Sequence, residues 1–207
     1  MRVLAFVLAL LAAGPVAAAD LTVSVRGPAG KPVPDAVVTV YPAGGVPGGP
    51  IHFDWPLRMA QHNRQFEPFV LVVPAGGVVA FPNQDEVRHE VYSFSLAHPF
   101  QLKLYGKDET RTVRFEKVGV IALGCNIHDQ MVSFIKVVDT PYAAKTDAAG
   151  DVVLHGLPAG AVSIHVWHPY LKGGLDEVTR PATLHASGDH EVMTIDVRTV
   201  VRRSGTY

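Results

Sequence analysis

Four side chains that bind soft and borderline metal ions lie in two short segments of the chain. Cys125, His128 and Met131 stand close together in Gly-Cys-Asn-Ile-His-Asp-Gln-Met, and His89 ends the upstream segment Phe-Pro-Asn-Gln-Asp-Glu-Val-Arg-His. Cys125 is the only cysteine. One thiolate, two imidazoles and one thioether are the donors of a blue-copper electron-transfer site. We therefore expect one mononuclear type 1 copper ion held by His89, Cys125, His128 and Met131.

The sequence predicts strands on both sides of these donors. Three of the donors would lie in a tight loop between a strand at 120–123 and a strand at 132–138, and His89 follows a strand at 78–81. Short β-branched runs bounded by turn residues recur along the chain, and no helical period extends beyond two turns after the N-terminal segment. This pattern indicates an all-β sandwich protein. The other predicted strands are 21–25, 36–41, 70–73, 91–94, 101–104, 112–115, 152–154, 161–167 and 192–197.

Other interpretations agree less well with the types of the four donors and with their order along the chain. A structural zinc site usually has several thiolates, and a dinuclear copper centre needs a second cysteine. A lone cysteine is often a buried apolar residue, and lone histidines are often surface or core residues. The joint order and spacing of all four donors favour the copper site. His165, Trp167 and His168 could form a second site, but a packed tryptophan with polar neighbours explains this strand as well.

The segment from Met59 to Pro141 resembles the cupredoxins described as methylamine utilisation proteins. Its Cys-x2-His-x2-Met loop is similar to the short ligand loop of amicyanins. The resemblance implies that His89, Cys125 and His128 are equatorial ligands and that Met131 is axial. It also implies that the amide of Asn83 hydrogen-bonds across to the ligand loop.

The same resemblance implies an electron carrier rather than an enzyme. Electrons would leave through the exposed edge of His128. A dehydrogenase and a c-type cytochrome would dock transiently near that edge.

The flanks resemble a carboxypeptidase-regulatory or transthyretin-like sandwich. Gly27-Pro-Ala-Gly-Lys-Pro-Val-Pro-Asp begins this similarity, and Leu154-His-Gly-Leu-Pro-Ala-Gly continues it. We expect a split sandwich of residues 20–50 plus 139–200, with a cupredoxin-like domain of residues 51–138 inserted in it. Such insertion is tolerated because the entropy of loop closure grows slowly with length. The rival organisation has two consecutive domains, with residues 20–46 added to the copper sandwich as extra strands.

The N-terminus predicts export. Arg2, an apolar run and Ala17-Ala18-Ala19 have the order of a cleavable signal peptide, so we expect cleavage near Ala19 or Asp20 and a periplasmic or otherwise exported protein. No other stretch is long and apolar enough to span a membrane. A formal net charge of −1 without a basic cluster gives no reason to expect nucleic-acid binding.

Three functions remain open from the sequence. The leading one is a carrier of single electrons. The second is a copper-binding or delivery protein without redox traffic, which would use the same donors in a more open site. The third is a β-sandwich scaffold or adhesion module that binds no metal.

Overall fold

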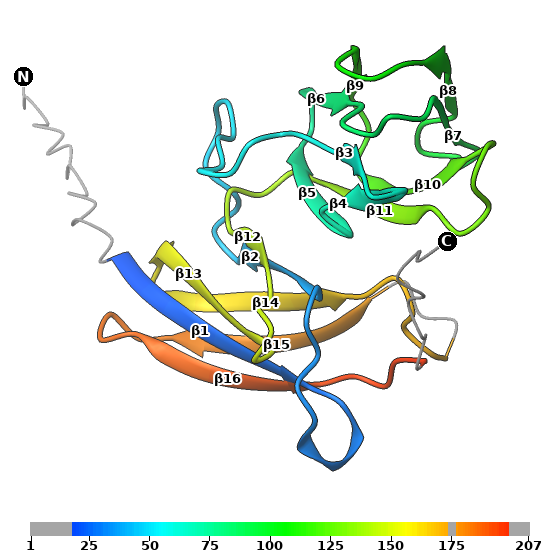
Figure 1. Ribbon diagram of the computed structural model, residues 1–207. Coiled ribbons are helices and arrows are strands. Elements are labelled where there is room, and N and C mark those ends of the chain that lie inside the picture. The colour runs from blue at the N-terminus through cyan, green and yellow to red at the C-terminus, as the bar shows by residue number, and fades with distance from the viewer. Residues whose placement is uncertain (1–17, 174–176, 199–207) are drawn as a thin grey trace, which may run out of the picture.

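The computed structural model describes residues 18–173 and 177–198, and confirms the predicted all-β class (Figure 1). The only helical element among the described residues is the short 3-10 turn η1 (Pro28–Gly30). The strands are β1 (Ala18–Arg26), β2 (Val37–Pro42), β3 (Ala60–His62), β4 (Gln65–Glu67), β5 (Val70–Pro74), β6 (Gly77–Pro82), β7 (His89–Ser93), β8 (Phe100–Tyr105), β9 (Thr110–Phe115), β10 (Gly119–Cys125), β11 (Val132–Val138), β12 (Ala143–Lys145), β13 (Asp151–Pro158), β14 (Gly160–Trp167), β15 (Val178–Leu184) and β16 (Asp189–Thr194).

The strands from β3 to β11 form the upper part of the molecule in Figure 1. A five-stranded sheet has the order β5-β11-β10-β7-β8, and the pairs β6–β9 and β3–β4 accompany it. Alternate residues of a strand face opposite sides of its sheet. In β10 this period buries Ile121, Leu123 and Cys125 and leaves Ala122 exposed. The cysteine is therefore directed toward the core of the upper part, where Phe81 also lies.

The remaining strands form the lower part of the molecule. One sheet has the order β13-β1-β16 and the other has the order β12-β2-β14-β15. Leu21 and Val23 of β1 share a core with Ile164 and Val166 of β14. The chain thus leaves this core after β2, forms the upper part, and returns to the same core from β12 onward (Figure 1).

A third apolar cluster joins the two parts. Val70 and Val72 of β5 and Val138 of β11 pack in it with Val37 of β2 and Trp167 of β14. These residues come from the facing sides of two sheets, so the outer face of the upper sheet is partly covered by the lower part.

An ion-pair network lies beside this third cluster. The Lys136 ammonium is 2.6 Å from Glu177 Oε1 and 5.7 Å from the ring centroid of Trp167. The other oxygen of Glu177 is 2.8 Å from His165 Nδ1. His165 and Trp167 therefore have structural partners at the contact between the two parts.

Two glycines with similar backbone angles allow a matched test of packing. A Cβ on Gly150 (φ +75°) would lie 2.7 Å from the Val25 carbonyl oxygen and 2.8 Å from the Val33 nitrogen, whereas a Cβ on Gly30 (φ +73°) would have nothing within 4 Å. Alanine at either position pays about 1 kcal/mol for the left-handed conformation. Gly150→Ala should lose about 2 kcal/mol more because backbone atoms must move. Urea unfolding of both variants measures this difference, and equal losses would contradict the packing described around Gly150.

Several sequence expectations differ from the structure. β3, β4 and β12 were not predicted, because each is only three residues long. β15 was also not predicted, since Pro181 and alternating polar residues argue against a strand there. It is an edge strand, where a proline costs no ladder hydrogen bond. The last strand, β16, ends at Thr194 and not at the predicted residue 197.

Most of the predicted signal peptide lies outside the described residues, and Ala18 and Ala19 begin β1. Its cleavage stays a prediction. Among the described residues, no helix has the length and apolar character needed to cross a membrane.

Candidate metal centre

Neighbouring strand ends bring the predicted equatorial ligands together. β10 lies between β7 and β11 in the five-stranded sheet, and Cys125 at its end pairs with Val91 of β7. His89 is the first residue of β7. The loop after Cys125 carries His128 and turns back into β11, and the Met131 amide closes it by donating to the His128 carbonyl at 2.9 Å.

The donor atoms of His89, Cys125 and His128 lie within 4.8 Å of one another. Cys125 Sγ lies 3.6 Å from His89 Nδ1. The two imidazole centroids are 5.1 Å apart. His89 and Cys125 are buried and His128 is partly buried. Among the described residues, this is the only group of three or more His, Cys, Asp or Glu side chains with such a geometry.

One buried nitrogen of this group has no hydrogen-bond partner among the residues that the structure describes. Nδ1 of His128 is buried, and no hydrogen bond reaches it within the described part of the chain. A buried polar atom without a partner normally costs free energy or has a functional reason. The lone pair of a neutral imidazole at this place fits a metal ion shared with His89 and Cys125.

The electrostatics of the site favour a thiolate and a neutral second imidazole. Burial alone would raise the pKa of Cys125, but hydrogen bonds from His89 and from the backbone of Ile127, Glu90 and His128 outweigh it and lower this pKa. Burial and the nearby charges of His89 and Arg64 lower the pKa of His128. Metal ligands must be deprotonated, so both shifts suit metal binding.

Asp85 is a member of the site that the sequence analysis missed. Its carboxylate Oδ2 is 2.7 Å from His89 Nε2, so the carboxylate orients the ring and leaves Nδ1 directed at the thiol. Burial by itself lowers the pKa of His89, but the hydrogen bonds to Cys125 and Asp85 together raise it. Arg64 donates its backbone N–H to the same oxygen of Asp85 at 3.0 Å. In the sequence, the only indication of this contact is that Asp85 stands four positions before His89.

The predicted hydrogen bond from Asn83 to the ligand loop is wrong. The Asn83 amide donates to the carbonyls of Val87 and Tyr105, and its oxygen accepts the Asp85 N–H at 2.9 Å. Its amide nitrogen thus bonds to its own loop and to the end of β8, and not to the ligand loop. Asn83 thus fixes Asp85, which in turn orients His89.

Met131 is 1% exposed and lies in the same apolar cluster as Cys125. Its axial role stays a prediction. A second buried thioether, Met59, also lies in this cluster, but the Ser133 hydroxyl donates to its sulfur at 3.4 Å.

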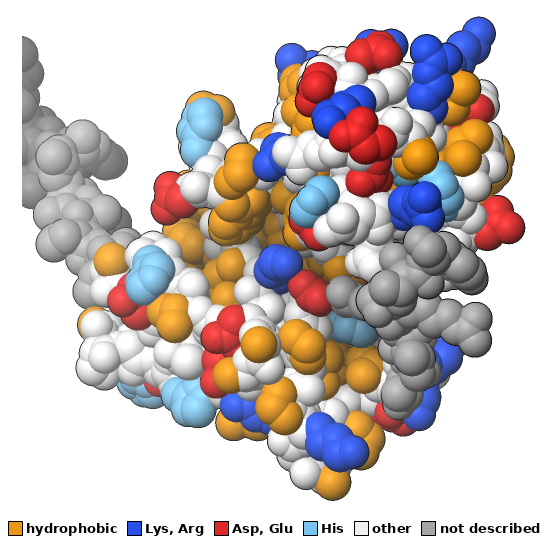
Figure 2. All heavy atoms as spheres, in the orientation of Figure 1, with side chains coloured by type: hydrophobic (Ala, Val, Ile, Leu, Met, Phe, Trp, Pro, Cys, Tyr) orange, Lys and Arg blue, Asp and Glu red, His pale blue; other side chains and the backbone are white. Residues whose placement is uncertain are grey.

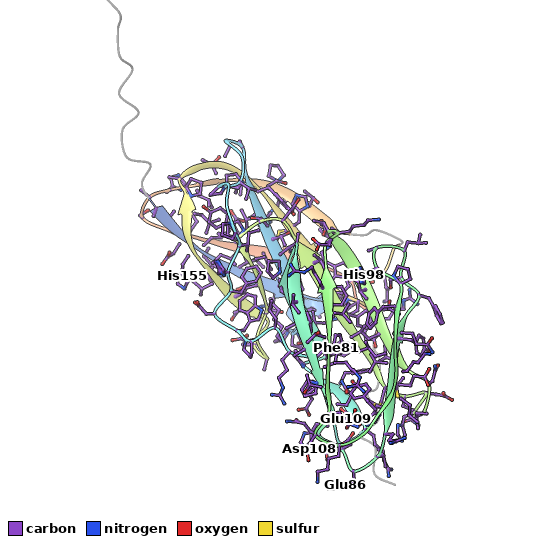
Figure 3. The ribbon with its side chains drawn as sticks, turned by 90° about the horizontal axis from the view of Figure 1, so that it is seen from above. Phe81, Glu86, His98, Asp108, Glu109 and His155 are labelled. Atoms are coloured by element: carbon purple, nitrogen blue, oxygen red, sulfur yellow. The ribbon has the colours of Figure 1, made fainter. Side chains whose placement is uncertain are left out.

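Two ion pairs lie near the end of the upper part that carries the predicted ligands. Figure 3 labels Glu86, Asp108 and Glu109 close together there, with His98 toward the other end and His155 on the lower part. Glu86 pairs with Lys107, and Glu109 lies 2.8 Å from Arg111.

No family model and no curated protein matches the chain. A Cu-containing nitrite reductase from Thermus scotoductus is 26% identical over 45% of this chain and 25% of that chain, with a TM-score of 0.39. A purple cupredoxin from Nitrosopumilus maritimus is 22% identical over 39% of this chain and 98% of that chain, with a TM-score of 0.36. A reduced variant of amicyanin is 17% identical over 50% of this chain and 99% of that chain, with a TM-score of 0.38.

The chain thus spans about a quarter of the length of the nitrite reductase. With TM-scores below 0.5, these similarities do not by themselves assign a function. The case for a metal centre depends on the geometry of His89, Cys125 and His128.

Proposed function

We propose that this protein binds one type 1 copper ion and carries single electrons between redox partners. The observation that carries the proposal is the convergence of His89, Cys125 and His128, whose donor atoms lie within 4.8 Å of one another in a largely buried place where His128 Nδ1 has no hydrogen-bond partner among the described residues. A thiolate and two imidazoles are the equatorial donor set of such sites, with a weak axial thioether that we assign to Met131. A copper ion held there would supply one-electron redox chemistry.

The protein fixes its ligands before any metal arrives. Asp85 holds His89, and backbone N–H groups hold the sulfur of Cys125. A preorganised donor set changes little when the charge of the centre changes, which suits rapid electron transfer. This rigidity favours electron transfer over copper delivery, which needs an open and adaptable site.

The surface around His128 supports contact with a protein partner. Next to the partly buried His128, Ile127 is 48% exposed and Val132 is 43% exposed. An apolar surface beside a ligand suits brief docking of another redox protein. We propose a dehydrogenase and a c-type cytochrome as the partners. We also propose a role in methylamine utilisation, which rests on the similarity of the ligand loop to that of amicyanins.

We further propose that the upper part is a cupredoxin-like domain inserted into a transthyretin-like sandwich. The common core of β1, β2 and β14 supports this, since the segments before and after the insertion pack together. We propose an exported, periplasmic location on the basis of the predicted signal peptide.

Electron transfer and delivery differ in how fast the ion leaves. We expect the Cu(I)-loaded protein to exchange electrons rapidly with a soluble cytochrome c but to release copper to bicinchoninate only over hours. Stopped-flow absorbance measures the electron exchange and any release within seconds, and a conventional absorbance time course measures release over hours. Release within seconds together with slow electron exchange would favour the delivery function.

Asp85→Asn should weaken copper binding by about tenfold to hundredfold, because residues that orient a ligating histidine typically have effects of this size. The amide can still hydrogen-bond to His89 Nε2, but it lacks the carboxylate charge. Competitive Cu(II) titration measures the affinity. Asp129→Asn, at an exposed position of the ligand loop, is the matched control and should leave the affinity unchanged. Equal affinities for both variants would show that Asp85 does not support the site.

A further inference from the structure

A crevice lies between the two parts of the molecule. Its volume is about 360 Å³, within the range of small-molecule sites. β5 and β12 each stand at the edge of a sheet, and Val70 to Val72 and Ala144 of these strands line the crevice. Figure 2 shows a hollow with hydrophobic side chains between the two parts, bordered by charged groups. None of the predicted copper ligands lines it.

The wall of the crevice is apolar and held in place. Trp55 stacks on Phe53 with ring centroids 4.4 Å apart, and its indole N–H donates to the Val72 carbonyl at 2.9 Å. Pro68 and Leu71 add further apolar surface. A wall of this kind needs little ordering when a ligand binds, so less affinity is lost to entropy.

Two of the three charged side chains that line the crevice have ion-pair partners. Lys145 lies 2.9 Å from Asp35 Oδ1, and Glu67 lies 3.4 Å from His62. The Arg58 guanidinium has no hydrogen-bond or ion-pair partner among the described residues. An unpaired guanidinium is a donor for a carboxylate, which it can bind through two parallel hydrogen bonds.

We propose that this crevice binds a small amphipathic carboxylate. The apolar body of the ligand lies against Trp55 and Pro68, and its carboxylate pairs with Arg58. The charge of Arg58 selects an anion over a cation or a neutral molecule of the same shape. This binding site is separate from the proposed copper centre and does not depend on it.

The test is a tryptophan-fluorescence titration of the full chain with octanoate, and with octylammonium as a cation with the same apolar body. The chain has two tryptophans, so Trp55→Phe identifies the part of the signal that comes from the crevice. We expect a saturable change with octanoate that is lost in Trp55→Phe, and at least about tenfold weaker binding of octylammonium.

Two variants test whether the carboxylate binds at Arg58. Arg58→Gln should weaken octanoate binding by about tenfold, whereas Arg114→Gln, at an exposed arginine on β9, should not change it. Equal binding of octanoate and octylammonium, unchanged octanoate binding in Arg58→Gln, or the absence of saturable binding would each overturn the proposal.

Discussion

Replacing Cys125 with serine is expected to abolish the intense visible colour of the Cu(II)-loaded protein and to leave the sheets folded. The colour of a type 1 site comes from charge transfer between the thiolate and copper, and a serine hydroxyl is too weakly acidic and too hard a donor to replace it. Cys125 is buried next to backbone N–H groups of Ile127, Glu90 and His128, which can also hydrogen-bond to a hydroxyl oxygen. Visible absorption and far-ultraviolet circular dichroism measure the two effects.

Ser133→Ala is the control for this variant. The Ser133 hydroxyl is buried on β11, the strand beside β10, and it donates to the sulfur of Met59 and not to the predicted ligands. This variant should keep the colour. Retention of the colour in Cys125→Ser would show that the ligand assignment is wrong.

Glu177→Leu is expected to destabilise the protein by about 3 kcal/mol, because it leaves the charge of Lys136 without its partner in a buried place. The side chain of Lys136 is 10% exposed, and its ammonium is 2.6 Å from Glu177. The double variant Lys136→Met with Glu177→Leu should recover most of the loss, since it removes both charges. Urea unfolding measures the free energies, and a double variant as unstable as the single one would contradict the importance of this ion pair.

The same ion pair gives a pH dependence with a defined sign. Burial would raise the pKa of Glu177, but Lys136 and His165 outweigh it, so the pKa in the folded protein is below its ordinary value of 4.5. A lowered pKa stabilises the folded state above the ordinary value, and this contribution is lost as the pH falls through the lowered pKa. We therefore expect the wild-type protein to lose stability relative to the double variant as the pH falls below about 4.5. A constant difference down to pH 3 would contradict this prediction.

The sequence predicted the class of fold and most strands, because the period of β10 and β11 is clear and turn residues mark their ends. It did not predict β15, whose Pro181 is tolerated only because the strand is at an edge. It also could not predict that Trp167 lies between the two parts, since that depends on how two sheets pack and not on a local pattern.

For the site, the order and spacing of the donors predicted the grouping of His89, Cys125 and His128 that the structure shows. The groups that support the donors were not predictable in the same way. Asn83 was expected to reach the ligand loop but bonds to Val87 in its own loop and to Tyr105 at the end of β8, and Asp85 orients His89 in a loop that has no periodic pattern. Hydrogen bonds in such loops depend on backbone geometry that composition and periodicity do not specify.

The most direct test of the copper site is the visible absorption spectrum of the protein with one equivalent of Cu(II), recorded again after ascorbate and after reoxidation. The geometry of His89, Cys125 and His128 predicts an intense band in the red that disappears on reduction and returns on oxidation. A folded protein that shows no such band would contradict the type 1 copper site and the electron-carrier function.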